Sequence, residues 1–193
     1  MMVSNDLTAG FADPIADSQA TFRALLDAMA HPGQVTPCAV LDAPSPLHSA
    51  TAAAVLTLAD HETPLWIDPE AAACGHWLTF HTGAPQTTTP ADANFVLVLS
   101  LPDLATLSNG TDEAPEASAT IILQVSSLTV GRRYRLAGPG LRVPEILAVE
   151  GLPADFAAIW ARNRALFPRG VDLILCCGDR VAALPRSVSI QEV

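Results

Sequence analysis

The 193-residue chain contains no lysine, and all ten of its basic residues are arginine. A phosphate-cradling P-loop ends in a glycine-lysine pair, and pyridoxal phosphate enzymes hold their cofactor through a lysine Schiff base. The composition therefore excludes both mechanisms in their usual forms. We expect no cofactor on this chain.

Cysteine is sparse and irregularly placed. The four cysteines, Cys38, Cys74, Cys176 and Cys177, form no CxxC pair and no spacing typical of a zinc site or a disulfide framework. Cys176 and Cys177 lie in the apolar run VDLILCC. Because neighbouring side chains of a strand alternate, we expect these two thiols to be small strand residues on opposite faces.

Long apolar runs are also missing. The most apolar stretches, 93–99 and 119–125, are far shorter than the roughly 20 residues that a membrane-spanning helix needs. They have the length of buried strands. The first ten residues lack the charged and then apolar pattern of a signal peptide, so we expect a cytoplasmic protein without membrane contact.

The charge is strongly acidic and unevenly distributed. The formal net charge is −10; residues 1–131 carry fourteen acidic residues against Arg23 alone, whereas residues 132–193 carry nine arginines against six acidic residues. Phosphate-backbone binding needs a clustered cationic surface, so this balance excludes nucleic acid as a general partner. A small arginine-lined anion pocket in the last third stays open.

Length and composition predict one globular domain over residues 1–193, with 1–16 as a flexible or extended N-terminal segment. Periodicity and capping signals predict helices at 17–30, at 49–59, from Asp68-Pro69-Glu70 to just before Gly83, and from Pro153 to about Leu166. In the first of these, Asp17 is the expected cap, and the expected core stripe is Phe22, Leu25, Leu26 and Met29.

Strands are predicted at 65–67, 95–100, 120–125, 133–137, 171–177 and 180–184. The last two should form a hairpin through Gly178-Asp179, a two-residue connection suited to the primed turns. This alternation predicts an α/β fold, a three-layer mixed sheet with helices on both faces.

Several motif-like patterns fail on inspection. Gly138-Pro139-Gly140 begins like a dinucleotide-binding loop, but Val143 occupies the third glycine position and no helix start follows. No GxSxG elbow is present, so nucleophilic hydrolysis has no support. Catalytic residues therefore stay unknown at this point.

Metal ligation is likewise unsupported. His76 and His81, with Cys74 nearby, are five residues apart, whereas two ligands on one helix face need a spacing of three or four. The acidic set Asp112, Glu113 and Glu116 is interrupted by Pro115, which favours a loop of solvated charges. We expect no metal site.

Arg132, Arg133 and Arg135 form the densest basic cluster. In an extended strand Arg133 and Arg135 project from one face and Arg132 from the other. Two neighbouring guanidinium groups suit a phosphate or carboxylate ligand. The competing interpretation, which we favour, is structural pairing with carboxylates, within the chain or across a subunit contact.

Five segments closely resemble the PhnH family, the H subunit of the bacterial carbon-phosphorus lyase system. They are TFRALLDAMAHPG (21–33), LTLADHETPLW (56–66), FHTGAP (80–85), GTDEAPEASATIILQV (110–125) and FPRGVDLILCCGDRVAALPR (167–186). The segments follow the family's order and reach across most of the chain. Blocks such as Gly-Thr followed by Ala-Pro-Glu before an apolar strand combine rare features.

The resemblance implies a role in phosphonate breakdown. In that family the H subunit assembles with the G, I and J subunits into a core complex that couples a phosphonate to the ribose of ATP with loss of adenine. It also implies a homodimer in isolation, and a fold like the large domain of pyridoxal phosphate-dependent transferases without the cofactor.

Two functions of different classes follow from the sequence. The first is a non-catalytic assembly subunit. The second is a subunit that binds ATP, a phosphonate or the ribosyl product, for which the candidate residues are Arg133 and Arg135, Arg169 as a third contact, and His81, Thr82 and Gly83 as polar loop donors.

Overall fold

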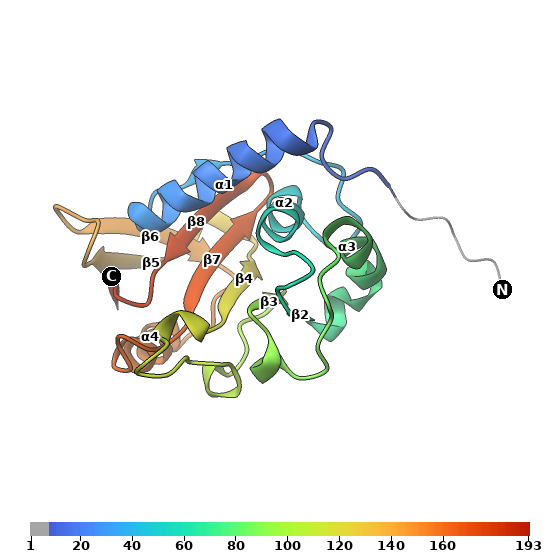
Figure 1. Cartoon of the computed structure of the whole chain (residues 1–193). Coiled ribbons are helices and arrows are strands. Elements are labelled where there is room, and N and C mark those ends of the chain that lie inside the picture. The colour runs from blue at the N-terminus through green and yellow to red at the C-terminus, as the bar shows by residue number, and fades with distance from the viewer. Residues whose placement is uncertain (1–7) are drawn as a thin grey trace.

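A six-stranded mixed sheet forms the middle layer of the structure, a computed structural model that describes residues 8–193 (Figure 1). In spatial order its strands are β1 (Thr36–Pro37), β8 (Arg180–Leu184), β7 (Asp172–Cys177), β4 (Thr120–Gln124), β3 (Phe95–Val98) and β2 (Leu65–Ile67). Strands β2, β3, β4 and β7 run parallel, and β8 and β1 add antiparallel pairs. The mixed α/β fold expected from the sequence is confirmed.

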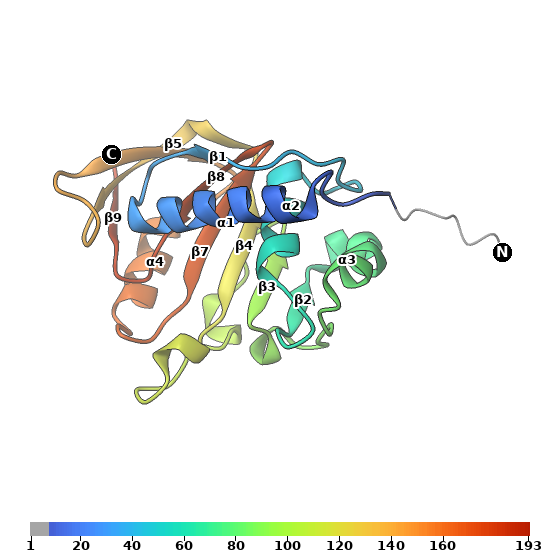
Figure 2. The same cartoon turned by 45° about the horizontal axis from the view of Figure 1, so that its top comes forward.

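Three helices cover one face of this sheet, and a fourth lies on the other. The first three are α1 (Pro14–Ala30), α2 (Ser49–Leu58) and α3 (Gly75–Thr82); the fourth is α4 (Phe156–Arg164). Figure 2 shows α1 crossing in front of the sheet beside α2, with α4 behind. Short 3₁₀ helices connect the strands at Pro69–Cys74, Pro90–Asp92, Leu104–Thr106 and Pro115–Ala117.

A second, three-stranded antiparallel sheet shares the α4 face. Its order is β6 (Glu145–Glu150), β5 (Ser127–Ala137) and β9 (Ser189–Glu192). Only residues 133–137 of this sheet were predicted as strand. The loop 138–144 joins β5 to β6 without a helix, as expected from the failed dinucleotide motif.

Helix α1 begins earlier than predicted. The carboxylate of Asp13, not that of Asp17, caps it by accepting hydrogen bonds from the backbone N–H groups of Ile15 and Ala16. Pro14 occupies the first turn, where its missing N–H has no intrahelical partner to lose. The predicted cap and start are therefore wrong by a few residues. Of the predicted N-terminal segment 1–16, residues 1–7 lie outside the described part.

The buried face of α1 also differs from the prediction. Leu25 is buried and Met29 partly so, but Phe22 is 46% and Leu26 54% exposed. The helix turns its small residues inward instead: Thr21, Ala24 and Ala28. Small side chains let α1 approach α2, whose own Ala50, Ala52, Ala53 and Ala54 are fully buried.

The remaining predicted elements match closely, with shifted ends. Asp68 caps the helical stretch that ends at Gly83, although its first six residues are 3₁₀. The C-terminal hairpin is confirmed, with Cys177 opposite Arg180 and a positive φ of 58° at Gly178. Helix α4 starts three residues after Pro153.

Two apolar clusters form the core, one on each face of the large sheet. The central strand β4 is buried on both faces, as expected for a parallel strand between two layers. Cys176 belongs to the cluster beneath the first three helices, and Cys177 packs against the other cluster, which confirms their predicted opposite orientation. Among residues 8–193 no helix is long and apolar enough to cross a membrane.

Candidate functional site

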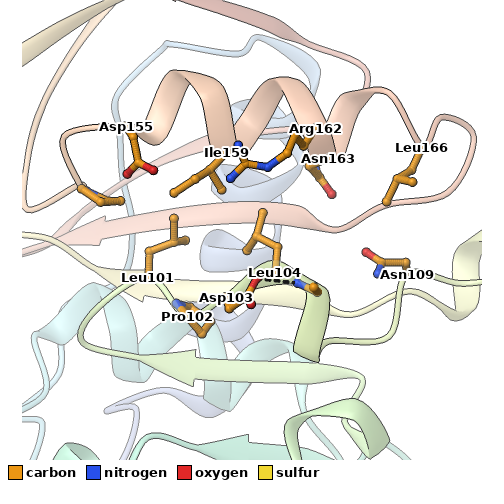
Figure 3. Close-up of a pocket in the computed structure, with 12 residues that line it drawn as sticks. Leu101, Pro102, Asp103, Leu104, Asn109, Asp155, Ile159, Arg162, Asn163 and Leu166 are labelled. Atoms are coloured by element: carbon orange, nitrogen blue, oxygen red, sulfur yellow. Dashed lines mark hydrogen bonds between the residues drawn. The ribbon is translucent and has the colours of Figure 1, made fainter.

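A cleft lies between α4 and the segment that follows β3 (Figure 3). Its volume is about 540 Å³, within the range of small-ligand sites. Leucine, isoleucine and proline side chains make up much of its wall, and Figure 3 shows Ile159 and Arg162 of α4 facing Leu104 across it. The lining residues are Leu101, Pro102, Asp103, Leu104, Ala105, Asn109, Pro153, Asp155, Ile159, Arg162, Asn163 and Leu166.

The charged groups of this cleft are Asp103, Asp155 and Arg162. With two carboxylates against one guanidinium, the lining is net negative. A triphosphate carries several negative charges and would meet like charge here. The cleft therefore suits neutral or cationic groups, or partner side chains, better than ATP.

The two asparagines of the cleft have different roles. Asn163 is buried, and its amide exchanges two hydrogen bonds of 2.9 Å with the backbone of Val171, so it holds α4 to the start of β7. The buried Oδ1 of Asn109 has no hydrogen-bond partner among residues 8–193. A ligand or partner that donates a hydrogen bond would satisfy this oxygen.

A second, more polar cleft of about 370 Å³ opens at the carboxyl ends of β3 and β4. Open α/β sheets commonly bind ligands at this edge. His48, at the start of α2, lines the cleft, and its Nδ1 accepts a hydrogen bond from the N–H of Gly178 at 3.2 Å. In a neutral imidazole this leaves the proton on Nε2.

Gln124 lines the same cleft, and both polar atoms of its amide form hydrogen bonds within the fold. Its Oε1 accepts hydrogen bonds from the His48 N–H and the Thr51 hydroxyl, and its Nε2 donates to the carbonyl of Pro46. The side chain thus ties the start of α2 to β4. Neither His48 nor Gln124 was predicted from the sequence as a site residue. The signal for Gln124 was a lone polar side chain ending the apolar strand TIILQ.

Several arginines of the last third form ion pairs within the chain. These are Arg132 with Glu192 at 2.6 Å, Arg169 with Asp112 at 3.0 Å, and Arg186 with Asp172. Arg186 also donates to the carbonyl of Pro115 and anchors that loop. Structural pairing, one of the two roles left open for the cluster of Arg132, Arg133 and Arg135, therefore applies to Arg132, and the other two arginines are paired in the same way.

Arg133 and Arg135 differ from those three. They project from the outer face of β5, while Tyr134 and Leu136 between and beside them are buried. Both are exposed, and neither has an ion-pair partner in the described part of the chain. Their Cα atoms are two strand residues, ~7 Å, apart.

His81, Thr82 and Gly83 end α3, far from these arginines. The Nε2 of His81 lies 3.1 Å from the carbonyl oxygen of Thr8, the Thr82 hydroxyl donates to a backbone carbonyl one turn earlier, and Gly83 ends the helix with a φ of 72°. Figure 1 shows α3 and β5 at opposite ends of the molecule. The structure therefore does not join the six candidate residues into one site.

The cysteines are unsuited to nucleophilic catalysis. Burial, followed by the carboxylate of Asp179, raises the pKa of Cys38 to about 11, and complete burial raises the pKa of Cys176 further. Burial also raises the pKa of Cys74 and Cys177. A thiol that stays protonated at neutral pH is a weak nucleophile. Residues 8–193 contain no group of three or more histidine, cysteine or acidic side chains placed to bind a metal ion.

Comparison with known proteins gives a consistent result. The family model described as bacterial phosphonate metabolism protein (PhnH) matches residues 9–191. The alpha-D-ribose 1-methylphosphonate 5-triphosphate synthase subunit PhnH of Rhizobium meliloti (strain 1021) is 37% identical over 190 residues, which cover 95% of each chain. The putative C-P lyase subunit protein HtxG of Stutzerimonas stutzeri is 36% identical over 173 residues, 89% of this chain and 85% of the relative.

Proposed function

The chain belongs to the PhnH family of bacterial phosphonate metabolism proteins, and we propose that it is a subunit of a carbon-phosphorus lyase core complex. In this role it supports the formation of ribose 1-phosphonate 5-triphosphate from ATP and an alkylphosphonate. The observation that carries the proposal is the 37% identity, over 95% of both chains, to a subunit named for that synthase.

Within the complex the chain acts as an assembly subunit without its own catalytic site. Three features support this role: burial raises the pKa of the thiols, the cleft beside α4 has a net negative lining, and the polar groups of Gln124 and Asn163 form hydrogen bonds within the fold. The exposed side chains suited to protein contacts include Arg133 and Arg135 of β5 and apolar residues of α1.

The proposed partners are the G, I and J subunits, and the isolated chain forms a homodimer. The proposed location of the complex is the cytoplasm. The test is co-expression of the three partner subunits with and without this chain. We expect that only the combination with this chain gives the full complex by mass and the full rate of adenine release from ATP with methylphosphonate. Full yield and full rate without it would overturn the proposal.

The proposed fold relationship is to the large domain of pyridoxal phosphate-dependent transferases. The parallel strands β2, β3, β4 and β7 between helical layers support it, and the absence of lysine accounts for a domain that has kept the framework without the cofactor. Superposition on such a domain tests the relationship: a different strand order would contradict it. The same lysine-free sequence underlies the proposal that this subunit uses no cofactor of its own.

A second candidate function is anion binding at Arg133 and Arg135, because these exposed arginines lie on one face without an ion-pair partner in the described part of the chain. Arg169, His81, Thr82 and Gly83 remain the further candidate contacts. Calorimetric titration of the isolated chain with ATP and with methylphosphonate tests this function, with Arg133→Ala/Arg135→Ala as the matched variant. Absence of heat near millimolar ligand would rule out an autonomous site.

A further inference from the structure

The outer face of α1 carries a row of exposed apolar side chains. Ile15 is 74%, Phe22 46% and Leu26 54% exposed. Their spacings of seven and four residues place all three on one side of an α-helix. Figures 1 and 2 show why they are uncovered: α2 and the large sheet lie on the inner side of α1, and its outer side forms the surface of the molecule.

This row is long enough to form a contact surface. Eleven residues of helix separate Ile15 from Leu26, a rise of about 16 Å. A shallow groove of about 270 Å³ lies beside its middle, lined by Phe22, Thr57 of α2 and the polar residues Ser18, Gln19 and Arg23. Single exposed apolar residues are ordinary, but an aligned row beside a groove is typical of an interaction surface.

Charge distinguishes between the occupants that could cover this face. Asp13 and Asp17 lie at one end of α1 and Asp27 near the other, with His31 2.9 Å from Asp27. The one basic side chain on α1, Arg23, donates a hydrogen bond to Gln19. A second copy of this chain, bound about a two-fold axis, would bring two acidic helices together. A partner with basic side chains around an apolar centre would instead be complementary.

We propose that the outer face of α1 docks onto another subunit of the complex, one that presents an apolar surface rimmed by lysine or arginine. The proposal rests on the proposed function, because it assigns a contact within that assembly. It predicts that salt weakens the contact through the acidic rim, while the apolar row supplies most of the affinity.

The test compares variants of the full-length chain co-expressed with its partner subunits. Leu26→Glu introduces a charge at an exposed position, and glutamate is itself a good helix former. Ile15→Asp adds an acidic residue to the first turn of α1, where the helix dipole favours negative charge. We expect each to weaken partner binding at least tenfold. Val143→Glu, 63% exposed between β5 and β6, is the matched control and should bind as the wild type does.

Two further measurements complete the test. Thermal unfolding verifies that each variant is folded, and Leu26→Gln replaces Leu26→Glu if the charge prevents folding. The affinity of the double variant Asp17→Asn/Asp27→Asn for the partner should fall less between low and physiological salt than that of the wild type, because the variant lacks two charges of the rim.

The outcomes separate this inference from the proposed function. If the wild-type chain binds no partner subunit, the proposed function fails. If the wild type binds and both α1 variants bind equally well, the α1 inference is overturned and the proposed function stands. If the variants convert a wild-type dimer into a monomer without loss of partner binding, the face is a self-interface, which also overturns the inference.

Discussion

Alkaline pH should destabilise the fold through its buried thiols. Cys176 is fully buried, and burial raises its pKa; burial likewise raises the pKa of Cys38 to about 11. An unfolded thiol ionises near pH 8.5. A group whose pKa is higher in the folded than in the unfolded chain makes its full contribution to stability at pH values below its pKa in the unfolded chain. This contribution is lost as the pH rises toward its pKa in the folded chain.

The magnitude follows from proton counting. A thiol that is protonated in the folded chain and ionised in the unfolded chain lowers the free energy of unfolding by about 1.4 kcal/mol per pH unit. Cys176 alone should therefore account for roughly that slope between pH 9 and 10. At pH 7, Cys176→Ala should have a free energy of unfolding about 1 kcal/mol lower than the wild type, because it leaves a small cavity. Above pH 9, its free energy of unfolding should fall less steeply with pH than that of the wild type.

The measurement is urea unfolding in the presence of reductant, monitored by tryptophan fluorescence and repeated at several pH values between 7 and 10. It gives the slope of the free energy of unfolding against pH for the wild type and for Cys176→Ala. Trp77 and Trp160 are buried and report the transition. Because the chain has no lysine, no ammonium group of a side chain titrates in this range and obscures the thiols. Equal slopes for the wild type and Cys176→Ala would refute the reasoning, as would stability that rises with pH.

The other predictions concern single contacts, each measured by urea unfolding. A Cβ on Gly140, at a φ of 83°, would lie 2.2 Å from a backbone oxygen, so Gly140→Ala should lower the free energy of unfolding by more than about 3 kcal/mol. Gly178 has open space around it, so Gly178→Ala should lower the free energy of unfolding by only about 1 kcal/mol. Equal losses in the two variants would contradict this account. Arg186→Ala and Asp172→Asn should each lower the free energy of unfolding by about 3 kcal/mol, because the two side chains are only 15% and 16% exposed and each variant leaves the other without its partner. Additive losses in the double variant would disprove the coupling of the two side chains. Gln124→Ala should lower the free energy of unfolding by about 2 kcal/mol, because it leaves partly buried groups without a hydrogen-bond partner, and a loss below about 0.5 kcal/mol would argue against that role.

Local signals predicted most elements of the large sheet. The structures of the apolar run 119–125 and of the turn at Gly178 are determined by the residues of these short segments themselves. Strands β6 and β9 were not predicted, because EILAVE and SIQE become strands through pairing with β5, which lies elsewhere in the chain. The rotation of α1 was missed for a similar reason: packing against the alanines of α2 decides which face is buried.

The candidate site was less predictable than the fold. Alternation along a strand placed Arg133 and Arg135 together correctly, since it is a local property. The partner of Arg169 is Asp112, and that of Arg186 is Asp172, and no spacing rule predicts such pairs. The cleft beside α4 likewise brings together α4 and the segment after β3, which are more than forty residues apart in sequence.

The order of strands in the large sheet has a consequence for how the chain folds during synthesis. Strand β4 lies beside β7, yet the whole of β5, β6 and α4 is made between them. Until residue 172 leaves the ribosome, β4 presents an unpaired apolar edge, and β5 lacks β9. Such edges invite non-native pairing in unfinished chains. We therefore expect ribosome-bound chains that stop before β7 to remain protease-sensitive and to bind chaperones, with protection gained abruptly once β7, β8 and β9 have emerged.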